Sequence, residues 1–337
     1  MVRFILLLLS FIYGFIIRVF SGLASQNKQS FSCKVISVGN ITWGGTGKTV
    51  AVEYITRFLR SKGRRIAVIS RGYKRRTKDE GRRTIEELGD EPQMLKDKLP
   101  DVTVLSGPDR QVLIKSAISG SRADTAILDD GFQQWRINRD LDIVTIDANN
   151  PFGCRHMIPR GILREPLRAL KRADIFLLSK TDTAPDVSGL RDYLKKINPQ
   201  ALIVLSCHKE GGFVELFGKG LFIASEELKN KNVILASGIA DPGSFEKMAG
   251  RYFKQVFEHI RFDDHHNYSV DDAQKIMSLA AAKGAEAVVI TEKDAVKLKN
   301  LFLLQPEIIP VYVLKIELEI TQYEEEFHRR LLRACGC

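Results

Sequence analysis

Short runs of apolar residues recur along the chain, and most are continuous rather than alternating with polar positions. Continuous runs are typical of strands that are buried on both faces of a parallel sheet. Helical stretches separate them, so the pattern predicts a doubly wound α/β domain. The predicted strands of this domain are Val35–Val38, Ile66–Ile69, Val102–Leu105, Thr125–Leu128, Ile143–Ile146, Ile175–Leu178 and Leu202–Leu205.

A cluster of glycines between positions 211 and 220 interrupts the pattern and indicates a linker. Further apolar runs follow it and predict a second, smaller α/β domain: Val233–Leu235, Ala287–Ile290 and Val311–Leu314. The partly alternating stretch Tyr312–Ile320 could pair back across the linker, and Glu324–Arg333 predicts a closing helix.

The amino terminus is apolar from Phe4 to Ile17, with Arg3 before it and Arg18 after it. A helix of that length reaches about 21 Å, short of the ~30 Å hydrocarbon core of a bilayer, which disfavours a spanning helix. Three interpretations remain: a cleaved signal peptide, a core helix, or a helix that lies in the membrane interface with its arginines on lipid phosphates.

We favour the interfacial helix, because the phosphate-binding motif described below needs a nucleotide, which is found in the cytosol. The expected organisation is an N-terminal membrane-interface helix over 1–25, a core domain over 26–215, a smaller α/β domain over 216–310, and a return strand with a C-terminal helix over 311–337.

Composition places the chain among ordinary globular proteins, with 44% hydrophobic and 27% charged residues. Its 51 Lys and Arg against 41 Asp and Glu leave a charge of +10, which favours an anionic partner such as phosphate, nucleic acid or an acidic membrane. The basic stretch Lys74–Arg83 has no interleaved aromatic residues for base stacking, so we interpret it as a solvated loop. Five scattered cysteines argue against a disulfide scaffold or a structural zinc site and fit a reducing compartment.

The strongest motif is the segment Lys34–Thr49, KVISVGNITWGGTGKT, in which a buried strand runs into a glycine-rich loop and then a helix. Such a loop can turn successive backbone N–H groups towards a phosphate at the amino end of the helix. Lys48 can reach the β- and γ-phosphates, and Thr49 can offer its hydroxyl to Mg²⁺. The strict GxxxxGK[ST] pattern has glycine where this chain has Thr42. The predicted nucleotide-binding residues are Thr42, Trp43, Gly44, Gly45, Thr46, Gly47, Lys48 and Thr49.

A second nucleotide element is the segment TAILDDG at Thr125–Gly131, where an apolar strand ends in two acids. A carboxylate at this position can hold Mg²⁺ directly or through water. Asp129 and Asp130 are adjacent and point to opposite faces, so only one is the direct partner, and the sequence leaves open which one. The segment SKTD at Ser179–Asp182 is similar to a guanine-reading motif, but a helix-capping turn is the preferred interpretation.

Two further polar clusters carry no function on their own. Asp90 and Glu91 precede Pro92 and predict a loop or a helix start. The segment RFDDHHNY at Arg261–Tyr268 is compatible with a metal site, with an Asp–His pair for proton transfer, or with surface polarity.

Taken in order, these segments closely resemble the tetraacyldisaccharide 4'-kinases, the lipid A 4'-kinases of Gram-negative bacteria. The resemblance spans about residues 1 to 300. It is carried by GNITWGGTGKT, SRGY at Ser70–Tyr73, GDEP at Gly89–Pro92, DDGFQ at Asp129–Gln133, LREP at Leu163–Pro166, SGIADPGSF at Ser237–Phe245, DDHHNY at Asp263–Tyr268 and TEKDAVKL at Thr291–Leu298.

The resemblance implies a P-loop NTPase-like doubly wound domain and a smaller α/β domain, joined by a β-strand linker with the active site in the cleft between them. It implies a kinase that uses ATP and Mg²⁺ to phosphorylate the 4'-hydroxyl of a tetraacylated glucosamine disaccharide 1-phosphate, giving lipid IVA at the cytoplasmic face of the inner membrane. We expect a monomer that binds this lipid and the membrane surface and no nucleic acid.

The resemblance also assigns roles to residues. Asp90 would pair with His265 to activate the acceptor hydroxyl. The remaining implied catalytic and metal-binding residues are Lys48, Arg110, Arg164 and Glu165, with Thr49, Asp129 and Asp130 at the metal.

Two positions depart from the family pattern. Gln134 stands where histidine is usual after DDGFQ, and the segment Ile158–Ile162 reads IPRGI where LPAGP is usual. The main alternative is a membrane-associated P-loop ATPase switch of the MinD or ParA type. In that class a lysine precedes the two glycines of the loop, and here that position is Trp43.

Overall fold

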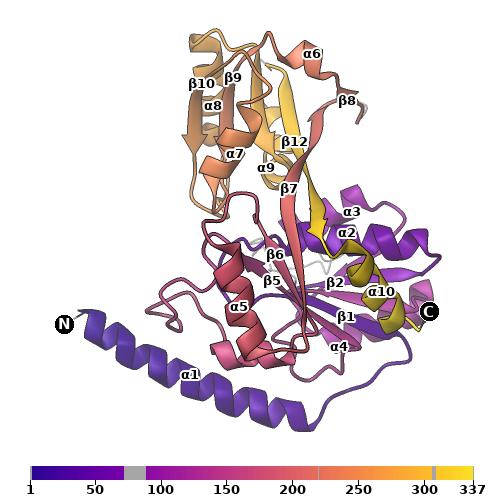
Figure 1. Ribbon diagram of the computed structural model, residues 1–337. Helices are drawn as coiled ribbons and strands as arrows, with labels where there is room; N and C mark the ends of the chain where they lie inside the picture. Colours follow the sequence, from indigo (N-terminus) through magenta and orange to yellow (C-terminus); the bar gives the residue numbers. More distant parts are fainter. Residues whose placement is uncertain (1, 72–88, 219, 306–308, 337) are drawn as a thin grey trace, which may run out of the picture. The chain divides into compact units, whose positions relative to one another are not determined.

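The computed structural model describes residues 2–71, 89–218, 220–305 and 309–336. The predicted basic loop Lys74–Arg83 and the end of the SRGY motif lie outside the described residues. The chain divides into two compact units (Figure 1): unit 1 is Met1–His208 with Leu318–Cys337, and unit 2 is Lys209–Glu317.

Unit 1 is built on a parallel sheet in the order β7-β6-β5-β1-β4-β2-β3. Its strands are β1 (Lys34–Gly39), β2 (Ile66–Ser70), β3 (Thr103–Ser106), β4 (Thr125–Asp129), β5 (Leu141–Asp147), β6 (Ile175–Ser179) and the start of β7 (Leu202–Glu215). All seven predicted strands are therefore present. Several are buried along their whole length, which explains their continuous apolar sequences.

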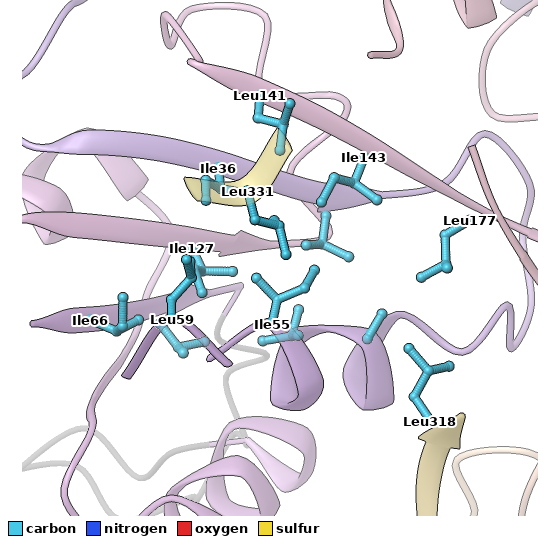
Figure 2. Close-up of a cluster of buried hydrophobic side chains, with 14 of the residues drawn as sticks. Ile36, Ile55, Leu59, Ile66, Ile127, Leu141, Ile143, Leu177, Leu318 and Leu331 are labelled. Carbon is cyan, nitrogen blue, oxygen red and sulfur yellow. The ribbon is translucent and has the colours of Figure 1, made fainter. Parts of the chain in front are cut away.

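Helices cover both faces of this sheet, as the strand–helix alternation predicts. One face packs on α2 (Lys48–Ser61), α3 (Asp90–Lys98) and α10 (Glu324–Ala334). Figure 2 shows Ile55 and Leu59 of α2 and Leu331 of α10 among strand side chains such as Ile36 and Ile143. The other face packs on α4 (Arg110–Ser121), α5 (Val187–Ile197) and the short 3₁₀ helix η1 (Leu167–Arg172).

Unit 2 has its own parallel strands in the order β10-β9-β11-β12. These are β9 (Asn232–Ser237), β10 (Gln255–Arg261), β11 (Ala287–Thr291) and β12 (Val311–Gln322), and β8 (Phe222–Ile223) pairs antiparallel with the end of β7. Helices α8 (Val270–Ala282) and α9 (Glu292–Phe302) cover one face and α7 (Pro242–Ala249) the other, while α6 (Ser225–Leu228) is a single turn. Strands β7 and β12 each run from one unit into the other.

The amino-terminal helix α1 (Val2–Gln26) lies close to the predicted bounds 1–25 but extends well beyond the apolar stretch Phe4–Ile17, from which its reach was calculated. At 1.5 Å per residue its 25 residues reach roughly 37 Å, so the expectation that it is too short to span a bilayer is wrong. The helix continues through Arg18, which the sequence pattern took as the end of the apolar stretch. By length and composition alone it could cross a membrane. Most of its large apolar side chains are exposed, which contradicts the core-helix interpretation.

Candidate phosphate-binding site

The phosphate-binding motif forms the turn between β1 and α2, at the carboxyl end of the central strand of unit 1. This is the edge at which open α/β sheets bind ligands. Gly44 and Gly47 have φ angles of 114° and 80°, which favour glycine. The loop ends at Gly47, the residue that precedes α2. The amino end of α2 therefore faces the loop with unpaired N–H groups.

Buried hydroxyl and amide groups next to the loop hold it in place through hydrogen bonds. The Thr46 hydroxyl is 2.7 Å from the Thr145 hydroxyl and accepts a 3.0 Å hydrogen bond from the Asn40 amide. Ser179 donates to the Thr46 carbonyl at 3.2 Å. These contacts fix the loop to the ends of β5 and β6. Asn40, Thr145 and Ser179 were not predicted as site residues, because nothing in their local sequence indicates a contact with the loop.

The two acids after β4 have different surroundings. The backbone of Asp130 is in the left-handed region, with φ 54°, and its carboxylate receives two hydrogen bonds from Arg164, at 2.7 and 3.0 Å. The Lys48 ammonium lies 3.8 Å from the same carboxylate. Burial acts to raise the pKa of Asp130, but the Arg164 hydrogen bonds and the charges of Lys48 and Arg110 outweigh it and lower the pKa.

Asp129 is almost fully buried, and one of its oxygens, Oδ1, has no hydrogen-bond partner. Its other oxygen accepts from the Ser70 hydroxyl at 3.3 Å. Burial, with the negative charges of Glu91 and Asp130, raises the pKa of Asp129 to about 7, although Lys48 and Arg110 act in the opposite direction. Asp129 is thus a buried acid whose ionised form lacks a full set of hydrogen-bond partners.

The surroundings of Asp129 predict how stability depends on pH. An unfolded aspartate loses its proton near pH 4, whereas the folded group keeps it to about 7. The folded state therefore binds more protons in this window and loses stability as pH rises through it. Asp129→Asn cannot ionise, so its melting temperature without nucleotide should exceed that of the wild type at pH 8, and the difference should shrink at pH 5. Asp101→Asn, at an exposed aspartate, is the control; a variant that melts lower than wild type at pH 8 would contradict this assignment.

Arg110 and Glu165 hold other parts of the site in place. The buried Arg110 guanidinium donates to the backbone carbonyls of Asp129 and Asp130 at 2.8 and 3.0 Å. The buried Glu165 carboxylate accepts from the two terminal guanidinium nitrogens of Arg172, at 2.9 and 3.0 Å, and from the Gln133 amide at 3.0 Å. Arg172 was not predicted as a partner, because it ends the arginine-rich stretch RGILREPLRALKR at 160–172, which gives no sign of which arginine turns inward.

The SKTD segment is not a helix-capping turn. The N-cap of α5 is Asp186, which accepts a hydrogen bond from the Gly189 N–H. Ser179 instead supports the phosphate loop, and Lys180 forms a 2.9 Å ion pair with Asp147 at the end of β5.

The two residues implied for acceptor activation lie in different units. Asp90 is in the first turn of α3, which confirms that its segment begins a helix. His265 follows β10 in unit 2, with a left-handed backbone at φ 62°. Its Nε2 lies 3.2 Å from the Lys293 ammonium, which also contacts Asp264 at 3.2 Å.

The fold and the loop geometry define a P-loop nucleotide-binding protein. The family model of the tetraacyldisaccharide-1-P 4'-kinases matches residues 2–336. Proteins named tetraacyldisaccharide 4'-kinase are similar to the chain: one from Halothermothrix orenii is 37% identical over 95% of this chain and 89% of its own length. Another, from Desulfatibacillum aliphaticivorans, is 34% identical over 95% and 90%. A crystal structure of LpxK from Aquifex aeolicus in complex with ATP matches with TM-score 0.76 and 28% identity over 99% of both chains.

The chain belongs to the tetraacyldisaccharide-1-P 4'-kinase family. It is therefore a kinase of lipid A biosynthesis. The expected resemblance and the fold class are confirmed, and a MinD- or ParA-type switch is not favoured.

Proposed function

We propose that the chain transfers the γ-phosphoryl group of ATP to the 4'-hydroxyl of a tetraacylated glucosamine disaccharide 1-phosphate, giving lipid IVA. The observation that carries the proposal is the arrangement of Lys48, Arg164 and the two acids beside the phosphate loop, in a chain that matches the kinase family from residue 2 to 336.

The residues around the loop fit a nucleotide with its magnesium ion. In phosphoryl transfer Mg²⁺ is held by one or two carboxylates, a hydroxyl and phosphate oxygens, and it neutralises charge on those phosphates. Asp129 and Asp130 would supply the carboxylates, only one of them bonded to the ion directly, and Thr49 at the start of α2 would supply the hydroxyl. The Asp129 Oδ1 atom, buried without a hydrogen-bond partner, is the observation that supports this fit. Among the residues that the structure describes, no three His, Cys, Asp or Glu side chains gather as a metal site.

Lys48 and Arg164 have complementary parts in this proposal. The Lys48 ammonium follows the loop directly and stabilises negative charge on the transferring phosphoryl group. Arg164 holds Asp130 with two parallel hydrogen bonds, a geometry that fixes the carboxylate plane as well as its charge. Arg110 and Glu165 position the site rather than contact substrate, because their hydrogen bonds go to backbone carbonyls, Arg172 and Gln133.

Asp90 and His265 act on the acceptor. A sugar hydroxyl is a poor nucleophile at neutral pH, and a positioned base contributes ~10²–10⁴-fold to its reaction. Asp90 accepts the hydroxyl proton, or orients His265 to accept it. The carboxylate of Asp90 lies in the first turn of α3.

The test is transfer of label from γ-labelled ATP to a tetraacyl disaccharide 1-phosphate in detergent micelles, with the same lipid already phosphorylated at the 4'-position as the control acceptor. We expect label on the first lipid and none on the second. Label on both lipids, or only release of inorganic phosphate, would contradict the proposed acceptor.

We propose that α1 holds the enzyme on the cytoplasmic face of the inner membrane as a monomer. Phe11 and Phe15 are both 68% exposed, and burying an aromatic side chain in lipid contributes roughly 1.5–3 kcal/mol. The double change Phe11→Glu, Phe15→Glu should therefore lower binding to anionic vesicles by more than about tenfold. Co-sedimentation measures this, and Val112→Glu, at an exposed valine of α4, is the matched control. Unchanged vesicle binding of the double variant would remove α1 as the anchor.

A further inference from the structure

One position of α1 differs from its neighbours. Ser10 is only 4% exposed, although the adjacent Phe11 is 68% exposed. Its hydroxyl lies 2.7 Å from the Met157 carbonyl, to which it can donate, and it accepts a 3.1 Å hydrogen bond from the Arg160 backbone N–H. A helix whose other large side chains are mostly exposed is thus joined to the rest of unit 1 through a buried polar group.

The same helix face makes two more contacts, at spacings of three and four residues from Ser10. The Tyr13 hydroxyl donates to the Arg164 carbonyl at 3.3 Å. Gly14 lies so close that an added Cβ atom would be 3.6 Å from Met157. The segment 157–164 therefore contacts α1 at both of its ends.

Segment 157–164 is also hydrogen-bonded to the phosphate loop. Leu163 forms an antiparallel bridge with Thr42. The Trp43 N–H donates to the Ile162 carbonyl and the Arg164 N–H to the Ile41 carbonyl, both at 2.7 Å. The Arg164 guanidinium then reaches Asn40 at 3.1 Å and Asp130. The Tyr13 bond thus ends on Arg164 itself, and the Ser10 bonds end at Met157 and Arg160, in the turn that leads into the loop contacts of Ile162 and Arg164.

We propose that Ser10, assisted by Tyr13, is a positioning residue of the kinase: it fixes segment 157–164, and through it Arg164 and the first half of the phosphate loop. The inference rests on the proposed function, in which Arg164 and the loop act on ATP. It assigns α1 a second task besides membrane binding, because the helix also holds segment 157–164 and, through it, the loop. Positioning of this kind matters, since a misplacement of about 1 Å can lower the rate roughly 10²-fold.

Backbone amide hydrogen exchange tests the contact without substrate. Ser10→Ala leaves the Arg160 N–H without its acceptor, and Tyr13→Phe removes the bond to Arg164. Both variants should show faster exchange in segment 157–164 and also at residues 41–43. Ser21→Ala is the matched control, because Ser21 lies on the same helix and donates only to its own backbone, at Arg18. Faster exchange confined to residues 157–160, or none, would overturn the inference.

Kinetics supply the second measurement. Ser10→Ala should lower kcat by about tenfold while binding anionic vesicles as the wild type does, because the variant loses the hydrogen bonds of the hydroxyl to Met157 and Arg160 but no apolar surface. The KM for the lipid should stay near the wild-type value. A parallel fall of kcat and vesicle binding would mean that Ser10 only anchors the helix, and would overturn the proposal. If the wild-type enzyme transfers no phosphate, the proposed function fails, whereas the exchange measurement still decides the role of Ser10.

Discussion

Replacing Asp90 with asparagine should lower lipid phosphorylation by about 10²–10⁴-fold and leave the Kd for ATP nearly unchanged. The variant keeps the shape of the side chain at the first turn of α3 but removes the charge that accepts a proton. Since we propose that the loop and its acids bind the nucleotide, ATP affinity should not depend on this carboxylate. Steady-state kinetics with the disaccharide lipid and equilibrium dialysis with ATP measure the two quantities.

Asp97→Asn is the matched control, because Asp97 lies in the last turns of the same helix and accepts only a surface hydrogen bond from Gln93. It should leave both quantities at wild-type values. If Asp90→Asn lowers ATP affinity as much as turnover, Asp90 belongs to the nucleotide site, and its assignment to the acceptor hydroxyl is wrong.

The change Lys48→Met should lower phosphoryl transfer by at least about 10²–10³-fold, the usual loss when one charge-stabilising group is removed. Methionine retains most of the length of the lysine side chain without its ammonium. ATP affinity should fall as well, because the ammonium is lost from a site that also contains two acids. Turnover and nucleotide binding, measured on the same preparation, give the two losses.

Lys62→Met provides the control at the other end of α2, where Lys62 lies over the Phe58 ring. It removes the same charge from the same helix at a distance from the loop. Transfer by Lys48→Met within about threefold of the wild type would show that the loop does not hold the transferring phosphate, since that loss is far below the expected 10²–10³-fold.

Most parallel strands of both units could be predicted, because a strand that is buried on both faces has a continuous apolar sequence. β4 and β6 are buried at every position, so each appears as an unbroken apolar run. β10 was missed, because it is an edge strand in which exposed Gln255, Glu258 and Arg261 interrupt the apolar residues. The reach of α1 was underestimated for a related reason: it was calculated from the apolar stretch that ends before Arg18, whereas Arg18 is exposed on a helix that continues past it.

In the site, too, contacts between residues close in sequence could be predicted, and contacts between distant residues could not. Lys48 and Thr49 follow their glycines directly in sequence, so the loop and its helix could be predicted together. The bond from Arg164 to Asp130 joins residues 34 positions apart, and only the family resemblance pointed to Arg164. The contacts of Thr46 with Thr145 and of Glu165 with Arg172 depend on which side chains the sheet brings together, which local patterns do not record.

Unit 1 is formed by two separate stretches of the chain, and this affects how it folds during translation. Leu318, Phe327, Leu331 and Cys335 belong to the same hydrophobic core as α2 and the strands beside it. During translation these residues leave the ribosome only after all of unit 2, so the nucleotide-binding unit must wait with an incomplete core while a whole second domain is synthesised. Frameshifts or stop codons that remove only the last twenty residues would therefore damage the first domain that is made.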